Sequence, residues 1–474
     1  MRMKRILSMF LMLALMLTGL AGCQGEAASE NPSESAAPVV NTEPTDEFVI
    51  YRPPYTPDWL RDTIVLFRQV YPDVSVTIED FSTTGTYQER REQYEDRINT
   101  ELSAGGGPDI VFLEDLSLNP YKAMRGNFYL DLTPFFEQDK YFSEDNFIPG
   151  VFDAGQYQGK QYIVPVNVRF PMFIARTPVL EQLGIDQVAT EDTAAFLRQI
   201  GEKSPQAQAE MNFDRMMDHS KYFSYFLTWA NLKLVDYENR QVCPEPEKVR
   251  SFMEAYKTYY EWDYSDEGLS ISGDIAFGAY DTDEITFLPK NFCYQALGDH
   301  RINFRHTASG YLEADGSYYD FFLRDMDGKA NTLYGDQVAV PVTSKNQLNA
   351  YRFIQLMLSE SIQKKLMTDP SGLYESWLSP VNREVMEAQI REEMSAIQLP
   401  VYHNGEYIGL IKAVPATDWL THIEKLNSVD SSVMFDDTVR QMVWEAMEPF
   451  FKDEKTYEAC FDELKSKLTI YMDE

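Results

Sequence analysis

The alternation of strand-like and helix-like segments constrains the fold of this chain more than any other feature. Residues 48–51 form a short apolar run typical of a strand, and residues 57–71 carry apolar side chains at the spacing of a helix packed on one face. Residues 74–78 alternate apolar and polar side chains, as a strand does. A charged helix is predicted at residues 87–104 and a buried, continuously apolar strand at residues 109–113. The pattern predicts parallel strands joined by right-handed crossover helices.

The length of the chain predicts two lobes. We expect the folded part to run from about Asp46 to Glu474, because large apolar residues are scarce just before it. A single hydrophobic core stops growing at about 250–300 residues. The folded part exceeds this size, so we expect two cores.

The first residues have the pattern of an export signal. A basic start at residues 1–5 precedes an apolar run at residues 6–20, which is short for a membrane span of about 20 apolar residues. The run closes with Leu20-Ala21-Gly22-Cys23, which resembles the lipobox of bacterial lipoproteins. The resemblance implies that residues 1–22 are a signal peptide, and that lipidated Cys23 anchors the protein to the extracytoplasmic face of the cell membrane. A plain secretory peptide that ends in cysteine by chance is the alternative.

Residues 23–45 are predicted to be a disordered tether. They are rich in Ala, Ser, Glu, Pro and Asn and contain almost no large apolar side chains. Such a segment cannot bury enough apolar surface to fold by itself. It therefore separates the anchor from the folded part.

The charge of the chain excludes some partners. The formal net charge is −33, which repels nucleic acid and anionic lipid. A role in DNA binding or in scavenging phosphate is therefore disfavoured.

The cysteines do not predict a metal or redox site. If Cys23 is lipidated, Cys243, Cys293 and Cys460 remain, and no C-x-x-C spacing joins them. One disulfide and three buried free thiols are both compatible with this count.

Four segments in order resemble the bacterial extracellular solute-binding proteins of the sugar-binding group, family 1. The segments are RINTELSAGGGPDIVFLED at residues 97–115, YLDLTPF at 129–135, GKQYIVP at 159–165 and GDQVAVPVTSK at 335–345. The resemblance extends from about Phe48 to the C-terminus. It implies an α/β, two-lobed fold of the periplasmic-binding-protein type II, whose hinged lobes close on a ligand in the cleft between them.

The resemblance also implies where the chain crosses between lobes. Crossovers are expected near residues 167–170, 340–344 and 380–393. One lobe would then combine residues 46–168 with 340–390, and the other 169–339 with 391–474. Ligands of open α/β sheets bind beyond the carboxyl ends of the strands, so the loops there are expected to supply the contacts.

A sugar site needs aromatic faces together with planar hydrogen-bonding side chains. Arg52 follows the first strand, and Trp59 is a weaker candidate that could instead pack in the core of its helix. Glu114 and Asp115 follow the third strand on opposite faces, so one of them at most faces the cleft easily. Asp115 could alternatively cap a helix.

The remaining candidates lie on the first crossover and in the second lobe. Asn167 is the leading candidate, because the family often places a polar contact there, while Arg169 could equally pair with a surface carboxylate. Residues 273–281 resemble a family strand followed by a pocket loop, which nominates Tyr280 and Asp281. The aromatic candidates, which could alternatively serve in packing, are Trp229, Tyr334 and Trp377.

Enzymatic and metal-binding patterns are weak. Asp281 with Asp283, or Asp325 with Asp327, could serve in glycoside hydrolysis, but residues 325–328 read as an Asp-Gly hairpin turn. The histidines have no metal-binding spacing, and there is neither a nucleophile elbow nor a phosphate loop. We expect no enzyme activity, no metal and no cofactor.

The sequence therefore predicts a monomeric, lipid-anchored subunit of an ABC importer. It would capture a carbohydrate, expected to be an oligosaccharide, and deliver it to permease subunits driven by a cytoplasmic ATPase. A surface lipoprotein for adhesion or sensing is the alternative, and a glycan-degrading enzyme is a weaker one.

Overall fold

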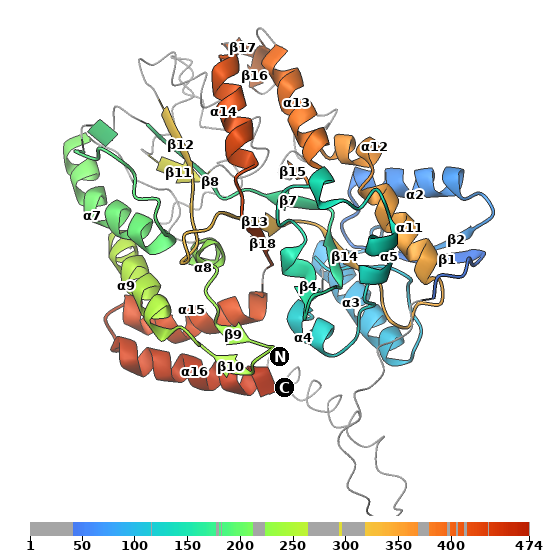
Figure 1. Ribbon diagram of the computed structural model, residues 1–474. Coiled ribbons are helices and arrows are strands. Elements are labelled where there is room, and N and C mark those ends of the chain that lie inside the picture. The colour runs from blue at the N-terminus through green and yellow to red at the C-terminus, as the bar shows by residue number, and fades with distance from the viewer. Residues whose placement is uncertain are drawn as a thin grey trace, which may run out of the picture. The chain divides into compact units, whose positions relative to one another are not determined.

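Figure 1 shows the computed structural model as a ribbon. Its buried apolar side chains form two clusters. The structure describes residues 41–473 apart from 115, 177–179, 182, 212–222, 264–292, 296–317, 368–378, 396–398, 404–405, 412–414 and 435. The first cluster comes from residues 48–172, 334–390 and 419–429, with Phe322, Ala330 and Met434. The second comes from residues 173–260 and 439–471, with Phe321, Leu323, Leu333 and Val433. The predicted signal peptide, Cys23 and most of the tether lie outside the described residues.

The first cluster begins with the predicted strand–helix–strand unit. β1 (Glu47–Arg52) and β2 (Ser75–Asp80) pair in parallel and are joined by α2 (Asp58–Val70). α3 (Tyr87–Ser103) begins with a capping box, in which Thr86 and Glu89 satisfy each other's backbone amides. β3 (Val111–Phe112) follows, and a parallel bridge joins the adjacent Ile110 to Ile50. The predicted α/β unit is confirmed.

Further elements complete the first cluster. A sheet of order β3-β14-β6 contains β6 (Ile163–Pro165) and β14 (Gln337–Ala339). The surrounding helices are α4 (Pro120–Arg125), α5 (Thr133–Gln138), η1 (Glu144–Asn146), η2 (Asp153–Gly155), α11 (Gln347–Met357), α12 (Glu360–Gln363), η5 (Lys364–Met367), α13 (Arg383–Ser395) and α14 (Ala416–Leu426). Two hairpins are formed by β4 (Gln156–Tyr157) with β5 (Lys160–Gln161), and by β16 (Leu399–His403) with β17 (Glu406–Ile411).

The second cluster is mostly helical. Its helices are α7 (Thr193–Met211), α8 (Phe223–Ala230), α9 (Pro246–Asp263), α15 (Asp437–Phe451) and α16 (Tyr457–Asp473). α15 and α16 lie side by side (Figure 1). Its strands are β8 (Met172–Arg176), β11 (Cys293–Gln295) and β12 (Tyr318–Phe322) in one sheet, and β9 (Val235–Asp236) with β10 (Gln241–Val242) in a hairpin.

A four-stranded sheet lies where the chain passes between the clusters. Its order is β15-β7-β13-β18, from β15 (Ser379–Pro380), β7 (Asn167–Arg169), β13 (Asn331–Tyr334) and β18 (Ser431–Val433). Just after β7 the buried side chains change from the first cluster to the second, and along β13 they change back. They change to the second cluster again after β18. The sheet therefore ties the connecting segments together.

The exact lobe boundaries stay a prediction. The sequence places residues 391–474 in the second lobe, whereas Trp419, Ile423 and Leu426 of α14 are buried in the first cluster.

The end of the predicted tether contacts the folded part. The backbone amide of Asn41 donates to Gln347 at 2.7 Å, and Asn349 donates to the carbonyl oxygen of Thr45 at 3.0 Å.

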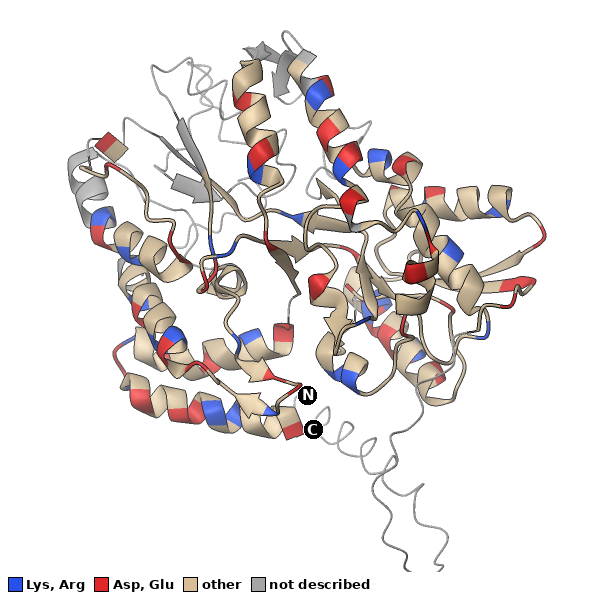
Figure 2. Ribbon diagram, in the orientation of Figure 1, with Lys and Arg blue, Asp and Glu red and all other residues tan. Residues whose placement is uncertain are grey.

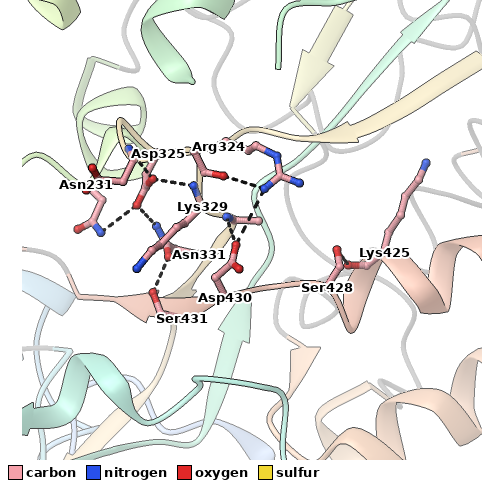
Figure 3. Close-up of polar contacts among 12 residues, drawn as sticks. Asn231, Arg324, Asp325, Lys329, Asn331, Lys425, Ser428, Asp430 and Ser431 are labelled. Atoms are coloured by element: carbon pink, nitrogen blue, oxygen red, sulfur yellow. Dashed lines mark hydrogen bonds and ion pairs between the residues drawn. The ribbon is translucent and has the colours of Figure 1, made fainter. Parts of the chain in front are cut away.

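The structure has a turn at residues 325–328, between β12 and β13, and it is organised by Asp325. The predicted hairpin is wrong, because β12 pairs with β8 and β13 pairs with β7 and β18. This carboxylate is buried and accepts from the backbone amides of Asp327 and Lys329 at 2.8 and 2.9 Å. It also accepts from Asn331 at 2.7 Å and from Asn231 at 3.3 Å, and Figure 3 shows these side chains converging on it. The turn is thereby fixed to α8 and to β13.

Charged side chains lie on both clusters, and two cysteines of the described residues are buried. Asp and Glu are spread over helices of both clusters, with Lys and Arg between them (Figure 2). Cys243 and Cys460 are buried free thiols, and burial raises the pKa of Cys243 to about 11. Within the described ranges, no helix is both long and apolar enough to cross a membrane.

Asp236, at the end of β9, gives a pH-dependent contribution to stability. Burial raises the pKa of its carboxyl, but hydrogen bonds from Asn239 and Lys233 and the charge of Lys233 lower it to about 2. A depressed carboxyl pKa stabilises the fold above the unfolded-state pKa of about 4, and this stabilisation is lost as the pH falls toward 2.

We expect Asp236→Asn to lower the free energy of unfolding by roughly 2 kcal/mol at pH 7 and by about half as much at pH 3. Urea unfolding across this pH range measures the difference. Asp473→Asn is the matched control, because its ion pair with Arg240 is more than half exposed on both side chains and contributes about 0–1 kcal/mol. An equal loss at both pH values would contradict the assignment.

Candidate ligand-binding site

A cavity of about 620 Å³ is lined by residues that belong to both clusters and to the sheet between them. This volume lies within the range of about 300–1,000 Å³ that small-molecule sites occupy. Its polar and aromatic lining residues are Tyr87, Arg91, Glu114, Ser117, Asn119, Arg169, Ser224, Tyr334, Gln337, Asp436, Asp437, Thr438, Arg440 and Gln441. The cavity therefore has the position and the size of a ligand cleft.

Three of the residues nominated from the sequence line this cavity. They are Glu114, which follows β3, Arg169 at the end of β7, and Tyr334 at the end of β13. β7 and β13 pair antiparallel with Leu333 opposite Arg169, which brings residues far apart in the sequence to one place. The strand ends supply the site, as expected for an α/β protein.

Arg169 is the cation best placed to meet a ligand. Its side chain is half-buried in the cavity wall. Its guanidinium makes no hydrogen bond or ion pair with another residue in the described part of the chain. A guanidinium offers five donors in a rigid fork, so it can bind several hydroxyl or carboxylate oxygens of one ligand.

Tyr334 serves both packing and the cavity wall. It is buried, and its hydroxyl accepts from the backbone amide of Gly155 at 3.1 Å. Burial raises the pKa of this phenol. The ring is thus held neutral and rigid, which suits an apolar face for a ligand.

Asn167 is fully buried and is not among the residues lining the cavity. Its amide nitrogen donates to the Asp336 carboxylate at 2.8 Å, and its carbonyl oxygen accepts from the Asp336 backbone amide at 2.8 Å. The indole of Trp59 donates to the same carboxylate at 3.0 Å. Asn167 and Trp59 therefore fix Asp336, which directly precedes Gln337 at the start of β14. Direct ligand contact by Asn167 stays a prediction.

The other nominated residues lie away from the cavity or outside the described residues. Arg52 pairs with Asp80 and donates to Ser82 at 3.3 Å, and Trp229 is buried in the second cluster. Burial raises the pKa of Asp80, but hydrogen bonds from Ser82 and the charge of Arg52 lower it below its ordinary value. The nominated residues outside the described ranges are Asp115, Tyr280, Asp281 and Trp377.

Sequence reasoning missed several residues of the cavity wall. Gln337 lies there, and its buried amide oxygen has no hydrogen-bond partner among the described residues. Asn119 and Asp436 are the N-cap residues of α4 and α15. The Asn-Pro pair at residues 119–120 is a helix-start signal that could have pointed to Asn119.

A second, smaller hollow lies beside the cavity, at the segment that follows β1. It is lined by Tyr55, Trp59 and Asp336, and it shares Glu114 and Gln337 with the larger cavity. The smaller hollow has a volume of only about 20 Å³, so its residues border the cavity and add no room for a further ring.

The charges in the larger cavity are balanced. Arg91, Arg169 and Arg440 face three carboxylates, those of Glu114, Asp436 and Asp437. Burial raises the pKa of Asp436, while hydrogen bonds from the Val439 backbone, Tyr237 and Asn119 oppose this effect. The mixture of donors, acceptors and aromatic rings suits a neutral, polyhydroxylated ligand.

The carboxylates considered for hydrolysis or metal binding are engaged elsewhere or lie outside the described residues. No group of three or more His, Cys, Asp or Glu side chains in the described ranges could hold a metal ion. The carboxylate of Asp325 is engaged in its turn, and Asp327 pairs with Lys248 at 2.5 Å. The pair of Asp281 and Asp283 lies outside the described residues.

A family model described as bacterial extracellular solute-binding protein matches residues 82–386. The match spans more than half of the chain and includes Glu114, Arg169, Tyr334 and Gln337. No curated protein matches the chain in sequence.

Solved structures show the same fold. The sugar-binding protein MalE from Xanthomonas citri superposes with a TM-score of 0.60 at 14% identity, covering 90% of this chain and 97% of the other. The cyclic alpha-maltosyl-1,6-maltose binding protein from Arthrobacter globiformis gives a TM-score of 0.57 at 13% identity, covering 91% and 99%. UgpB from Mycobacterium tuberculosis, solved with glycerophosphocholine, gives 0.52 at 14% identity, covering 91% and 99%. The predicted two-lobed binding-protein fold is confirmed.

Proposed function

Because this chain belongs to the bacterial extracellular solute-binding proteins, we propose that it captures a carbohydrate, most simply an oligosaccharide, and delivers it to an ABC importer. Capture occurs by closure of the two lobes around the cavity. The family supports an extracytoplasmic location and a role in binding rather than catalysis. The structural relatives support the same type of protein.

The observation that carries the carbohydrate assignment is the charge-balanced cavity itself. Three arginines and three carboxylates line it together with Tyr87, Tyr334 and the amides of Asn119, Gln337 and Gln441. A sugar ring stacks on aromatic faces and exchanges hydrogen bonds with planar polar groups. A strongly anionic ligand would instead favour an excess of cations.

The fold alone leaves the ligand class open. One structural relative is a sugar-binding MalE, whereas UgpB was solved with glycerophosphocholine, which contains a phosphate group. The proposal therefore depends on the residues of the cavity and not on the likeness in fold.

Calorimetry and thermal-shift measurements on the chain without its first 22 residues test the ligand class. The panel contains neutral oligosaccharides of different linkage, glycerophosphocholine, short peptides and a polyamine. We expect a neutral oligosaccharide to bind, and at 100 times its dissociation constant to stabilise the protein by about 2.7 kcal/mol. Tight binding of the peptide, the polyamine or glycerophosphocholine, with no response to any carbohydrate, would exclude the assignment.

We further propose that the protein acts as a monomer anchored through lipidated Cys23 beside its permease. A single acyl chain binds membranes weakly, so stable anchoring needs two or more chains. Cys23→Ser should abolish labelling with palmitate and release the protein from the membrane fraction. Persistent labelling of this variant would contradict the anchor. Loss of sugar uptake on deleting the gene separates transport from the alternative role in adhesion.

A further inference from the structure

A buried polar cluster joins the two apolar clusters beside the ligand cavity. It consists of Asn119 from the start of α4, Asp436 from the start of α15, and the hydroxyls of Tyr237 and Tyr471. α4 buries Ala123 and Met124 in the first cluster, whereas α15, Tyr237 and Tyr471 belong to the second. The contacts of Asn119 therefore cross from one cluster to the other.

The oxygen and the nitrogen of the Asn119 side-chain amide have different partners. Its oxygen accepts from the backbone amide of Lys122 at 2.8 Å and so caps α4. Its nitrogen carries two hydrogens and lies within hydrogen-bonding distance of three acceptors, which are the Asp436 carboxylate, the Tyr471 hydroxyl at 2.8 Å and the Tyr237 hydroxyl at 3.0 Å. One side chain thus starts a helix of the first cluster and contacts three groups of the second.

The two carboxylate oxygens of Asp436 also have different partners. One carboxylate oxygen accepts from the backbone amide of Val439 at 3.0 Å and caps α15. The other accepts from Asn119 and from the Tyr237 hydroxyl at 3.0 Å. Two helix starts, 317 positions apart in the sequence, are therefore coupled through one amide–carboxylate contact.

Neighbouring contacts reinforce this junction. The rings of Tyr121 and Tyr237 are stacked with centroids 5.5 Å apart, and the ammonium group of Lys122 lies 3.6 Å from the centre of the Tyr471 ring. The backbone amide of Gln158, in the β4–β5 turn, donates to Glu238 at 3.1 Å. Asn119 is only 7% exposed, so its amide–carboxylate contact is shielded from water and strengthened by the low local dielectric.

We propose that Asn119 and Asp436 form an interlobe latch that favours the closed arrangement and thereby sets the apparent affinity for the ligand. For a ligand that needs the closed form, the apparent dissociation constant equals the intrinsic dissociation constant divided by the fraction of closed protein. Weakening the latch lowers that fraction. Because Asn119 and Asp436 also line the cavity, closure is measured without ligand, where the loss of a ligand contact has no effect. The effect on affinity rests on the proposed function, whereas the effect on closure does not.

Asn119→Asp tests the latch while keeping the cap, since Asp caps helices as well as Asn does. It replaces the donor with a carboxylate next to Asp436, and two buried carboxylates repel each other. We expect small-angle scattering of the ligand-free variant to show a larger radius of gyration, and the affinity for the best oligosaccharide to fall about 10- to 100-fold.

The double variant Asn119→Asp with Asp436→Asn exchanges donor and acceptor and should restore the radius of gyration. Asn119→Ser, which keeps a cap without a charge, should open the protein less than Asn119→Asp does. Asn382→Asp is the matched control, because Asn382 caps α13 and donates to Tyr141 within the first cluster.

An unchanged radius of gyration in Asn119→Asp, or no restoration in the double variant, would overturn the latch. Scattering needs no ligand, so this outcome is distinct from a failure of the carbohydrate assignment. Far-UV circular dichroism checks that each variant is folded before the comparison is made.

Discussion

Asp325→Ala is expected to lower the free energy of unfolding of the second lobe by about 3–5 kcal/mol. The substitution removes the acceptor of four donors, the backbone amides of Asp327 and Lys329 and the side-chain amides of Asn231 and Asn331. Asp325 is only 2% exposed, so water cannot replace the lost contacts without opening the turn. Each unsatisfied buried group costs about 1–3 kcal/mol.

Asp327→Ala is the matched control for this prediction. It removes the same side chain two positions away, where the carboxylate is 56% exposed and pairs with Lys248. Exposed ion pairs contribute about 0–1 kcal/mol. Urea unfolding followed by circular dichroism measures both variants, and a similar loss in the two would show that Asp325 does not organise the turn.

Local features of the fold could be predicted because their signals are local. The strand–helix–strand unit of β1, α2 and β2 follows from side-chain periodicity, which depends only on near neighbours in the sequence. The turn at residues 325–328 follows from the backbone conformation that Gly328 adopts, with φ of 77°. In both cases the residues of one short segment determine the local backbone structure.

The directions of side chains in the site could not be predicted in this way. Asn167 and Arg169 are two positions apart on β7, so the sequence offered both as ligand contacts. The structure shows that the amide nitrogen and the amide oxygen of Asn167 both form hydrogen bonds with Asp336, which lies 169 residues further along the chain. Arg169 has no such partner in the described part of the chain.

The helix caps illustrate the same limit. An Asn before Pro120 signals a helix start, and the structure confirms that Asn119 caps α4. The partner of its amide nitrogen lies in a different cluster, at Asp436. This contact forms only because the two clusters pack against each other. The periodicity of the sequence therefore does not predict it.

Arg169→Ala is expected to weaken binding of the best oligosaccharide by about 10- to 100-fold. The guanidinium lines the cavity and forms no hydrogen bond or ion pair elsewhere within the described ranges, so its donors remain for the ligand. A hydrogen bond to a charged group contributes about 1.5–3 kcal/mol, which corresponds to this change in affinity. For the same reason, the free energy of unfolding without ligand should change little.

Arg169→Lys and Arg240→Ala complete this experiment, with titration calorimetry as the measurement. Lys keeps the charge but loses the planar fork, so we expect an affinity between those of the parent protein and Arg169→Ala. Arg240 pairs with Asp473 and is absent from the cavity lining, so its removal should leave the affinity unchanged. If Arg169→Ala binds as tightly as the parent, the ligand does not use this end of β7, and Gln337 and Glu114 become the contacts to test. If Arg169→Ala also unfolds more easily, the guanidinium stabilises the junction between the lobes, and the loss of affinity reports closure rather than contact.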